Sequence, residues 1–230
     1  AVKELVYDRK ELSLSEFYSV CEENFEHHES LRKKIIDSLP KYGTNNTEAD
    51  VFAAKVYRDI AALYRDENGH FYQNARGGEY LPAFYPHFSF VSLGRRTIAT
   101  PDGRRAYTPL SRGCSPSEFI ALDNPASILQ SLAHFDFTDF TDSFCTEITL
   151  QSLDKEKAVK VVSALIRIFL ANKGSSMQFN IYDRDTLIKA QKNPQQYGNI
   201  CVRVCGYSAV FVTLNKITQD EIISRAARRA

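Results

Sequence analysis

The stretch Ile200-Cys-Val-Arg-Val-Cys-Gly-Tyr-Ser-Ala-Val-Phe-Val-Thr-Leu214 places two β-prone runs on either side of a single glycine, Gly206. A lone glycine in a strand pattern marks a bulge, a tight bend or a close approach of the backbone. Arg203 is the only charged residue in this run, and a buried arginine needs partners. The pattern predicts two strands joined at Gly206 and leaves open whether Arg203 makes a structural ion pair or anchors the loop.

The segments before this stretch alternate between strand and helix patterns. β-prone runs predict strands over Cys145–Leu150 and Met177–Tyr182, and helical spacing predicts helices over Glu156–Ala171 and Arg184–Lys192. The Glu156–Ala171 helix is apolar almost all round, so we expect it to be buried. This alternation predicts an α/β arrangement.

A last helix is expected after the glycine stretch. Thr218 and Glu221 have the spacing of a capping box, and Ile217 and Ile222 occupy the matching staple positions. The pattern predicts a helix that runs to the end of the chain.

The first third of the chain reads as helical. Ser13 and Glu16 form a capping-box pattern that opens a helix to about Phe25. A second helix is expected over Glu29–Leu39, and a third from Thr47 to about Asp66. Apolar side chains repeat at helical spacing along the third helix, at Phe52, Val56, Ile60 and Leu63. We interpret these helices as an outer scaffold layer.

Residues 68–125 have a different composition and sequence pattern. Glycines, prolines and short aromatic or β-branched runs indicate strands joined by shaped loops, with Phe84–Leu93 and Arg95–Ala99 as the best strand candidates. Long irregular loops inside a compact domain are uncommon unless they are functional. The segment TPDGRRAYTPLSRG, residues 100–113, is therefore the first place to expect a built site.

Composition excludes several classes of function. The net charge of +1 and the lack of a basic stripe interleaved with aromatics argue against a nucleic-acid partner. No apolar run is long enough for a membrane span, and no secretion signal is visible. None of the five cysteines forms a C-x-x-C pair and the histidines show no ligand spacing, so no metal site is expected. Reduced thiols fit a cytoplasmic protein.

The run VRVCGYSAVFVTL, residues 202–214, closely resembles the radical signature of the glycyl radical enzymes, the superfamily that includes pyruvate formate-lyase. MQFNIYDRDTLIKAQKNPQQYGN resembles the strand and helix before the family's radical loop, and TPDGRRAYTPLSRG resembles its internal PDGR(R/K)A loop. NARGGEYLPAF and PKYGTNN are also similar to family segments. The resemblance covers nearly the whole chain in the family's order, and GYSAVF is closest to the dehydratase, decarboxylase and lyase branches.

The resemblance implies a helical N-terminal layer over residues 1–67, barrel strands and loops over residues 68–174, and a glycyl radical domain over residues 175–230, as one continuous unit of an α/β barrel with a buried radical loop. Gly206 would store the radical. Residues expected to support its loop are Arg203, Cys205, Tyr207, Gln178 and Asn180.

By the same resemblance, an activating enzyme that uses S-adenosylmethionine and an iron–sulfur cluster would abstract a hydrogen atom from Gly206. The radical would then oxidise a cysteine of the family's G-C-x-E motif to a thiyl radical that attacks the substrate. This chain has no G-C-x-E motif. Cys114, in RGCSPSEF, superficially echoes it, but Glu118 lies too far along, so Cys114 is not expected to be the thiyl site. Cys21, Cys145, Cys201 and Cys205 are interpreted as packing residues.

The leading hypothesis is a radical-bearing subunit or C-terminal portion that works with a larger chain carrying the catalytic cysteine. It would act in the cytoplasm of an anaerobic organism, with a bacterial microcompartment as one setting. Three alternatives stay open: an autonomous glycyl radical cofactor that repairs an oxygen-damaged enzyme, an anaerobic ribonucleotide reductase, and a structural descendant without radical chemistry. Substrate-binding residues and the substrate are not predicted.

Overall fold

The structure, a computed structural model, describes residues 1–84, 87–117, 119–120, 124, 126–151 and 154–226. The chain forms two compact units. Unit 1 contains Ala1–Lys41, Phe88–Ser111 and Ser117–Ile120, and unit 2 contains Tyr42–His87, Arg112–Pro116 and Ala121–Ala230. None of the described helices combines the length and apolar character needed to cross a bilayer.

Unit 1 is helical. A short π-helix, Lys3–Asp8, precedes α1, Leu14–Glu22, and α2, Glu29–Ser38. The predicted capping box of α1 is confirmed: the Glu16 amide donates to Ser13 Oγ at 3.2 Å, and the Ser13 amide donates to the Glu16 carboxylate at 2.7 Å. The unit has its own apolar core, formed chiefly by Leu5, Phe17, Val20, Cys21, Phe25 and Ile35.

The two strands expected over Phe84–Leu93 and Arg95–Ala99 are wrong. Among the residues of this stretch that the structure describes, which exclude 85 and 86, strand structure is confined to Ala83–Phe84, β1, and Ser89–Gly94 forms a short helix, α4. The helix buries Phe90, Val91 and Gly94 at helical rather than alternating spacing. Gly94 is required there, because a Cβ would lie 2.3 Å from the Thr108 carbonyl oxygen.

Residues 95–99 pair with no strand among the described residues. The Arg104 guanidinium donates to the Ile98 carbonyl, and the Tyr107 amide donates to the Thr97 carbonyl at 3.1 Å. The backbone groups that a sheet would satisfy are therefore satisfied by a loop.

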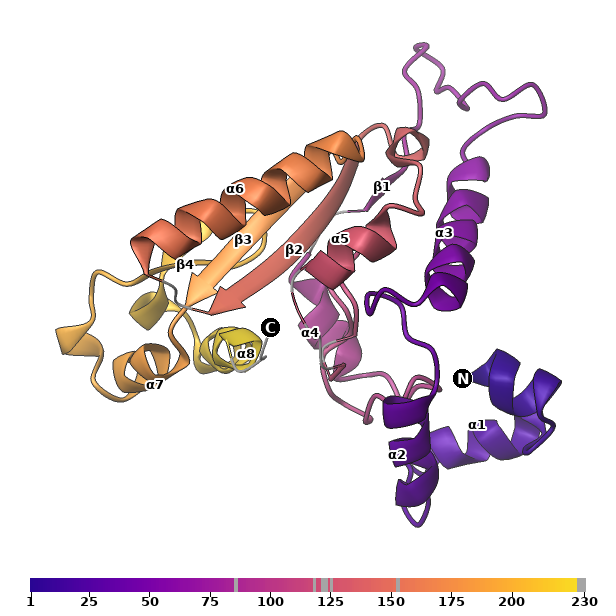
Figure 1. The fold of residues 1–230 in the computed structure, drawn as a ribbon, viewed down its shortest axis with the longest axis horizontal. Coiled ribbons are helices and arrows are strands. Elements are labelled where there is room, and N and C mark those ends of the chain that lie inside the picture. The colour runs from indigo at the N-terminus through magenta and orange to yellow at the C-terminus, as the bar shows by residue number, and fades with distance from the viewer. Residues whose placement is uncertain (85–86, 118, 121–123, 125, 152–153, 227–230) are drawn as a thin grey trace. The chain divides into compact units, whose positions relative to one another are not determined.

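Unit 2 is built on a parallel sheet with the strand order β1-β2-β3 (Figure 1). The strands β2, Ser143–Gln151, and β3, Ser176–Tyr182, agree with the predicted ones, and Cys145 pairs with Ser176 at the start of their register. The helix α6, Lys155–Ala171, makes the crossover between them, as a parallel pair requires.

The two faces of β2 carry different chemistry because successive strand side chains point to opposite sides. Phe144, Ile148 and Leu150 join Leu165 and Phe169 of α6 in the apolar core of the unit. The intervening residue Glu147 faces the other way and is 3% exposed. A charged residue is thus buried on the face opposite the apolar core.

The helix α3, Thr47–Ala62, and the shorter α5, Ala126–Leu132, contact each other in unit 2. Tyr57 packs edge-on against Phe84 and Phe135, with ring centroids 4.6 and 5.1 Å apart. The apolar repeat noted in the sequence does not form this core. Its members are 37–75% exposed: Phe52, Val56, Ile60 and Leu63.

The expectation that α6 is buried all round is wrong. Leu165 and Phe169 are buried, but Val159, Ile166 and Leu170 are exposed. One helix lying on one face of a sheet can bury only the stripe that faces the strands. Val159, Ile166, Ile168 and Leu170 on the other side of α6 are left uncovered by the described part of this chain.

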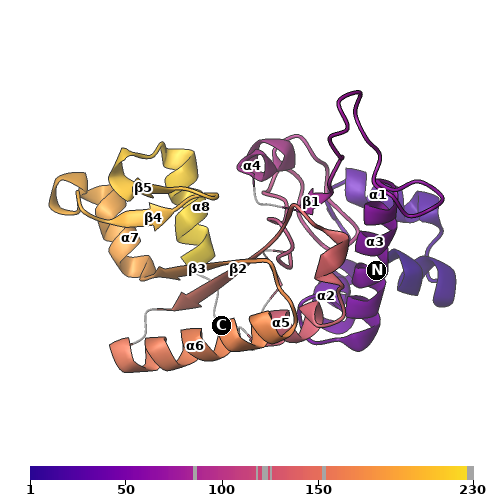
Figure 2. The same ribbon diagram turned by 90° about the horizontal axis from the view of Figure 1, so that it is seen from above.

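The last part of unit 2 lies on the face of the sheet opposite α6 (Figure 2). It comprises α7, Arg184–Lys192, the antiparallel pair β4, Cys201–Arg203, and β5, Ser208–Val210, and α8, Lys216–Ala226. Short 3₁₀ helices occur at Phe137–Asp139, Pro194–Gln196 and Phe211–Thr213.

The capping box expected at Thr218 and Glu221 is wrong. The helix α8 begins earlier, and Asn215 Oδ1 accepts from the Thr218 amide at 2.9 Å. Thr218 and Glu221 therefore lie inside the helix, and both are buried. The prediction that this helix reaches the end of the chain concerns residues 227–230, which lie outside the described residues. Glu118, considered above with Cys114, also lies outside them.

Candidate functional site

Gly206 lies at the turn that joins β4 to β5. Arg203 pairs with Ser208 across the two strands, and the Val204 amide donates to the Tyr207 carbonyl at 2.9 Å. Gly206 has a φ of +71°, in the left-handed region that favours glycine. A Cβ built on it would meet nothing within 4 Å, so its α-carbon faces open space in this chain.

The base of the hairpin is anchored by apolar side chains. Val202, Val204 and Phe211 are each no more than 1% exposed. Gly206 itself is exposed, and Tyr207 is 55% exposed. The loop expected to be buried thus has a buried base, but the described part of the chain leaves its turn uncovered.

Four charged side chains form a buried ion cluster beneath the hairpin, which we define as Arg112, Glu147, Glu221 and Arg225. Each is no more than 5% exposed. Arg112 Nη1 lies 2.6 Å from Glu147 Oε2, and Arg225 Nε donates to both Glu221 carboxylate oxygens at 2.7 and 2.8 Å.

Weaker contacts connect the two pairs of the ion cluster. Arg112 Nε lies 3.8 Å from Glu221 Oε1, and Arg225 Nη1 lies 3.9 Å from Glu147 Oε2. Burial opposes the charged form of Arg225, but hydrogen bonds and charge from Glu221, followed by Glu147, raise the pKa of Arg225 above its ordinary value. The cluster contains two positive and two negative groups, so it is balanced in charge.

The ion cluster touches the hairpin through its backbone. Arg225 Nη1 donates to the Arg203 carbonyl at 3.3 Å. The Arg203 side chain lies across the hairpin and donates to Ser208 Oγ at 3.3 Å. Arg203 therefore contacts the ion cluster through its main chain, while its guanidinium braces the two strands.

The two amides expected to support the loop lie on the same face of the sheet as Glu147. Asn180 is fully buried and its Nδ2 donates to Glu147 Oε2 at 3.2 Å. Gln178 Nε2 donates to Asn180 Oδ1 at 2.9 Å. These amides extend the ion cluster along β3.

Cys205 is half-buried beside the ion cluster. Burial raises the pKa of its thiol to about 11, against the effect of Arg225, which lowers it. Of the other cysteines, Cys21, Cys114 and Cys145 are buried, and Cys201 is exposed. Cys201 is therefore not a core residue, and the packing role expected for it is wrong, because its strand β4 presents that face to solvent.

The structure thus brings Cys205, Asn180 and Gln178 close to the ion cluster, together with the Arg203 backbone, and leaves Tyr207 exposed. Sequence reasoning did not find the ion cluster itself. A usable signal was present in the glutamate at position 147 of a strand predicted to be apolar. The Glu221–Arg225 spacing of four residues was another, because it places both side chains on one side of a helix.

The loop over residues 100–108 is a built structure of a different kind. The Arg104 guanidinium donates to the carbonyls of Arg105 and Thr108 at 3.0 and 2.7 Å, and Arg104 is 4% exposed. Asp102 accepts from Ser117 Oγ at 2.8 Å. Its polar side chains are used to shape the loop itself.

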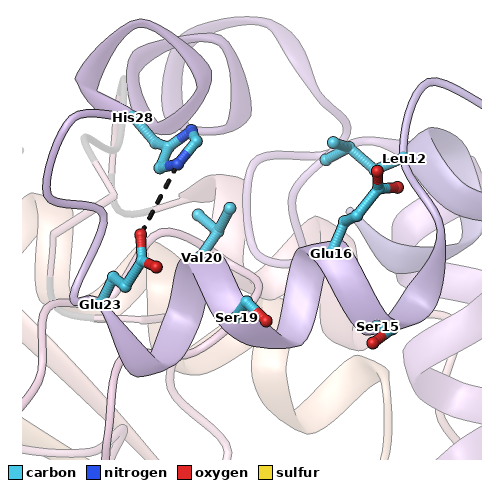
Figure 3. Close-up of a pocket in the computed structure, with 7 residues that line it drawn as sticks. All are labelled: Leu12, Ser15, Glu16, Ser19, Val20, Glu23 and His28. Atoms are coloured by element: carbon cyan, nitrogen blue, oxygen red, sulfur yellow. Dashed lines mark ion pairs between the residues drawn. The ribbon is translucent and has the colours of Figure 1, made fainter.

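A pocket of about 320 Å³ lies on α1 in unit 1 (Figure 3). It is lined by Leu12, Ser15, Glu16, Ser19, Val20, Glu23 and His28. His28 Nε2 lies 3.7 Å from Glu23 Oε2. The pocket contains none of the predicted site residues, and among the described residues no group of three or more His, Cys, Asp or Glu could hold a metal ion.

Two family models match the chain. The model described as "Glycine radical" covers residues 110–212, which include Gly206, and the model described as "Pyruvate formate lyase-like" covers residues 1–94. The chain belongs to the glycyl radical enzymes, and it matches a portion of their length.

Its relatives are dehydratases and lyases of that family. It is 32% identical to a probable dehydratase of Escherichia coli over 98% of this chain and 28% of the relative. It is 30% identical to trans-4-hydroxy-L-proline dehydratase of Clostridioides difficile, again over 98% of this chain and 28% of the relative.

Solved structures agree. A structure concerned with 1,2-propanediol dehydration in Roseburia inulinivorans superposes with a TM-score of 0.88 at 33% identity and covers 97% of this chain and 29% of that chain. The glycerol-bound dehydratase of Clostridium butyricum also gives a TM-score of 0.88, at 32% identity, over 97% of this chain and 28% of that chain. The chain therefore spans less than a third of the relatives that it matches.

Proposed function

We propose that this chain stores an organic radical on Gly206 and passes it to a catalytic cysteine on a larger portion of a glycyl radical enzyme, for dehydratase or lyase chemistry. The observation that supports the proposal best is the geometry of the turn. Gly206 lies within the segment matched by the glycine radical family, with a left-handed backbone and open space at its α-carbon.

The chemistry favours glycine at this position. Removal of one hydrogen atom from the α-carbon leaves an unpaired electron that spreads over the adjacent amide nitrogen and carbonyl group, which requires a planar centre. A side chain would oppose this planarity and obstruct the reagent that takes the hydrogen atom, and glycine alone has no Cβ. We propose that the reagent comes from an activating enzyme that uses S-adenosylmethionine and an iron–sulfur cluster.

The exposure of the turn supports the need for a partner. A stored radical must be kept from water and oxidants, yet Gly206 and Tyr207 are exposed in this chain. The partner would cover the turn and bring the catalytic cysteine to it. Since dioxygen attacks carbon-centred radicals, the proposal places the protein in an anaerobic cytoplasm.

The test is electron paramagnetic resonance of the chain after anaerobic incubation with its activating enzyme and the larger portion. We expect a glycine-centred doublet, split by the one remaining α-hydrogen, that collapses when the glycines are deuterated. Gly206→Ala should abolish the signal.

The matched control is Gly198→Ala. A Cβ at position 198 would also meet nothing within 4 Å, but Gly198 lacks the left-handed backbone of Gly206. This control should keep the signal. A signal that survives Gly206→Ala would overturn the assignment of the radical.

A further inference from the structure

The hairpin that carries Gly206 is too short to fix its own position. Each of its strands has three residues, and an isolated two-stranded hairpin is at best marginally stable in water. Its apolar anchors, Val202, Val204 and Phe211, hold the base of the hairpin. Apolar contacts are not directional, so they do not set where the turn points.

We infer that the buried ion cluster is the positioning device for the Gly206 turn, with Arg225 as its central residue. This inference rests on the proposed role of Gly206. The Arg225 guanidinium binds the Glu221 carboxylate through Nε and the Arg203 carbonyl through Nη1. One planar group thus joins α8 to the last residue of β4, three positions before Gly206.

The rest of the ion cluster extends this link to the sheet. Glu147 on β2 accepts from Arg112 at 2.6 Å and from Asn180 on β3 at 3.2 Å, and lies 3.9 Å from Arg225. Hydrogen bonds and ion pairs have preferred directions and distances. These contacts therefore fix the position of Arg203, and with it the position of the turn, relative to the strands β2 and β3.

Stability alone does not explain such a cluster. Removing charges from water is costly, and buried ion pairs are often no more stabilising than apolar residues of the same size. Registry is the best-attested use of buried ionic groups. Because this cluster lies directly beneath the radical-bearing hairpin, its directional contacts would set the position of that hairpin.

Arg225→Lys is the sharpest test because it keeps the charge balance of the ion cluster. A lysine ammonium is a single point of charge and lacks the rigid fork of a guanidinium. It cannot bind Glu221 and the Arg203 carbonyl with the same geometry. The variant should therefore leave the cluster neutral but release the turn.

The experiment measures two quantities in the activated, assembled enzyme: glycine-centred spins per chain, and turnover per spin. We expect Arg225→Lys to keep spins per chain within about twofold of the wild type and to lower turnover per spin by about 100-fold, since a misplacement of about 1 Å can reduce a rate that much. A merely structural role would lower the folded fraction and the spins together, and would leave turnover per spin unchanged.

The control is Lys216→Met, which removes the exposed ion pair with Asp220 on the same helix and should change neither quantity. If Arg225→Lys does not fold, Glu221→Asp is measured in the same way, and about a tenfold loss of turnover per spin is expected from its shorter reach. Turnover per spin equal to that of the wild type in the folded variant overturns the inference. Absence of a glycine signal in the wild type overturns the proposed function instead.

Discussion

Cys201 and Cys205 lie at the start and just beyond the end of one short strand but meet opposite surroundings. Cys201 is exposed, whereas Cys205 is half-buried above the ion cluster. Burial raises the pKa of the Cys205 thiol to about 11. Cys205 is therefore a neutral thiol at physiological pH, and it can stand beside a charged cluster without changing the charge balance.

The Cys205 environment predicts slow alkylation. With a pKa of about 11, roughly one molecule in a thousand carries the thiolate at pH 8. We expect iodoacetamide to modify Cys201 first, and the rate at Cys205 to rise about tenfold per pH unit between pH 7 and 9. Mass spectrometry of the peptide that contains both residues, in Cys201→Ser and Cys205→Ser variants, separates the two rates. A rate at Cys205 that does not change with pH would contradict the prediction.

At the scale of single residues, the sequence identified those candidate site residues that stand out in a local sequence pattern. The apolar run around Gly206 made the glycine and Arg203 stand out, and the alternation along β3 paired Gln178 with Asn180. Arg112 lies in the segment 100–113 where a built site was expected, but its meeting with Glu147 and Arg225 was missed. Residues 112 and 147 are 35 positions apart, and no local pattern reports that a loop, a strand and a helix meet. Only the folded chain places their charges together.

At the scale of single elements, α7 illustrates how a helix start is specified. Asp183 precedes the helix, and its Oδ1 accepts from the Thr186 amide at 2.7 Å. The buried side of the helix carries Leu187 and Ala190, and α7 contacts α8, the helix that carries Arg225. The cap therefore stabilises a neighbour of the ion cluster.

Asp183→Ala should lower the free energy of unfolding by about 1 kcal/mol, the usual effect of losing an N-cap. Hydrogen bonds from the Thr186 side chain and amide hold the pKa of Asp183 below its ordinary value. The stabilisation is then complete above the pKa of the unfolded chain, near 4, and is lost as the pH falls through the lower folded value.

Chemical denaturation at pH 7 and at pH 3 measures this effect. The difference between wild type and Asp183→Ala should shrink at pH 3. Asp185→Ala, which removes an exposed carboxylate in the first turn of the same helix, should change stability much less. Equal effects of the two substitutions would show that general charge, not the cap, is responsible.

Elements with strong local signals were predicted well, and those fixed by tertiary contacts were not. The boundaries of α7 agreed with its cap and the following Pro194. The helix α4 was missed because its aromatic residues also fit a strand and its short length depends on Gly94 against Thr108. The start of α8 was misplaced because Thr218 and Glu221 mimic a capping box while their side chains are buried in the fold.

At the scale of the whole molecule, two sets of apolar residues are exposed: the helically spaced residues noted on α3, and residues of α6, a helix expected to be buried. Phe52 on α3 is 58% exposed, Leu63 at the C-terminal cap of α3 is 75% exposed, and Leu170 on α6 is 63% exposed. Contiguous exposed apolar residues on a soluble protein indicate interaction surfaces. This chain spans about 28% of its relatives, and we expect the larger portion of the enzyme to cover the α3 residues.

This expectation is tested by Phe52→Ser combined with Leu63→Ser. Both side chains are exposed in the isolated chain, so the free energy of unfolding should change by less than about 0.5 kcal/mol. Binding to the larger portion, measured by calorimetry, should weaken at least about tenfold, because two large apolar contacts are lost.

The control is Lys55→Ser combined with Asp59→Ser, which removes an exposed ion pair from the same helix. It should leave the affinity within about twofold of the wild type. A Phe52→Ser and Leu63→Ser variant that binds as tightly as the wild type would exclude this face of α3 as the contact.

The two-sided nature of β2 has a consequence for how the chain finds its native pairing. If the register of β2 shifted by one position, Glu147 would enter the apolar core beneath α6, and Ile148 would lie among the guanidinium groups in its place. Both shifts cost free energy: the first buries an unpaired carboxylate, and the second leaves buried arginines without their carboxylate partner. The alternation along β2 thus favours the native register, and the same buried charges that contact the Gly206 hairpin also disfavour misaligned sheets.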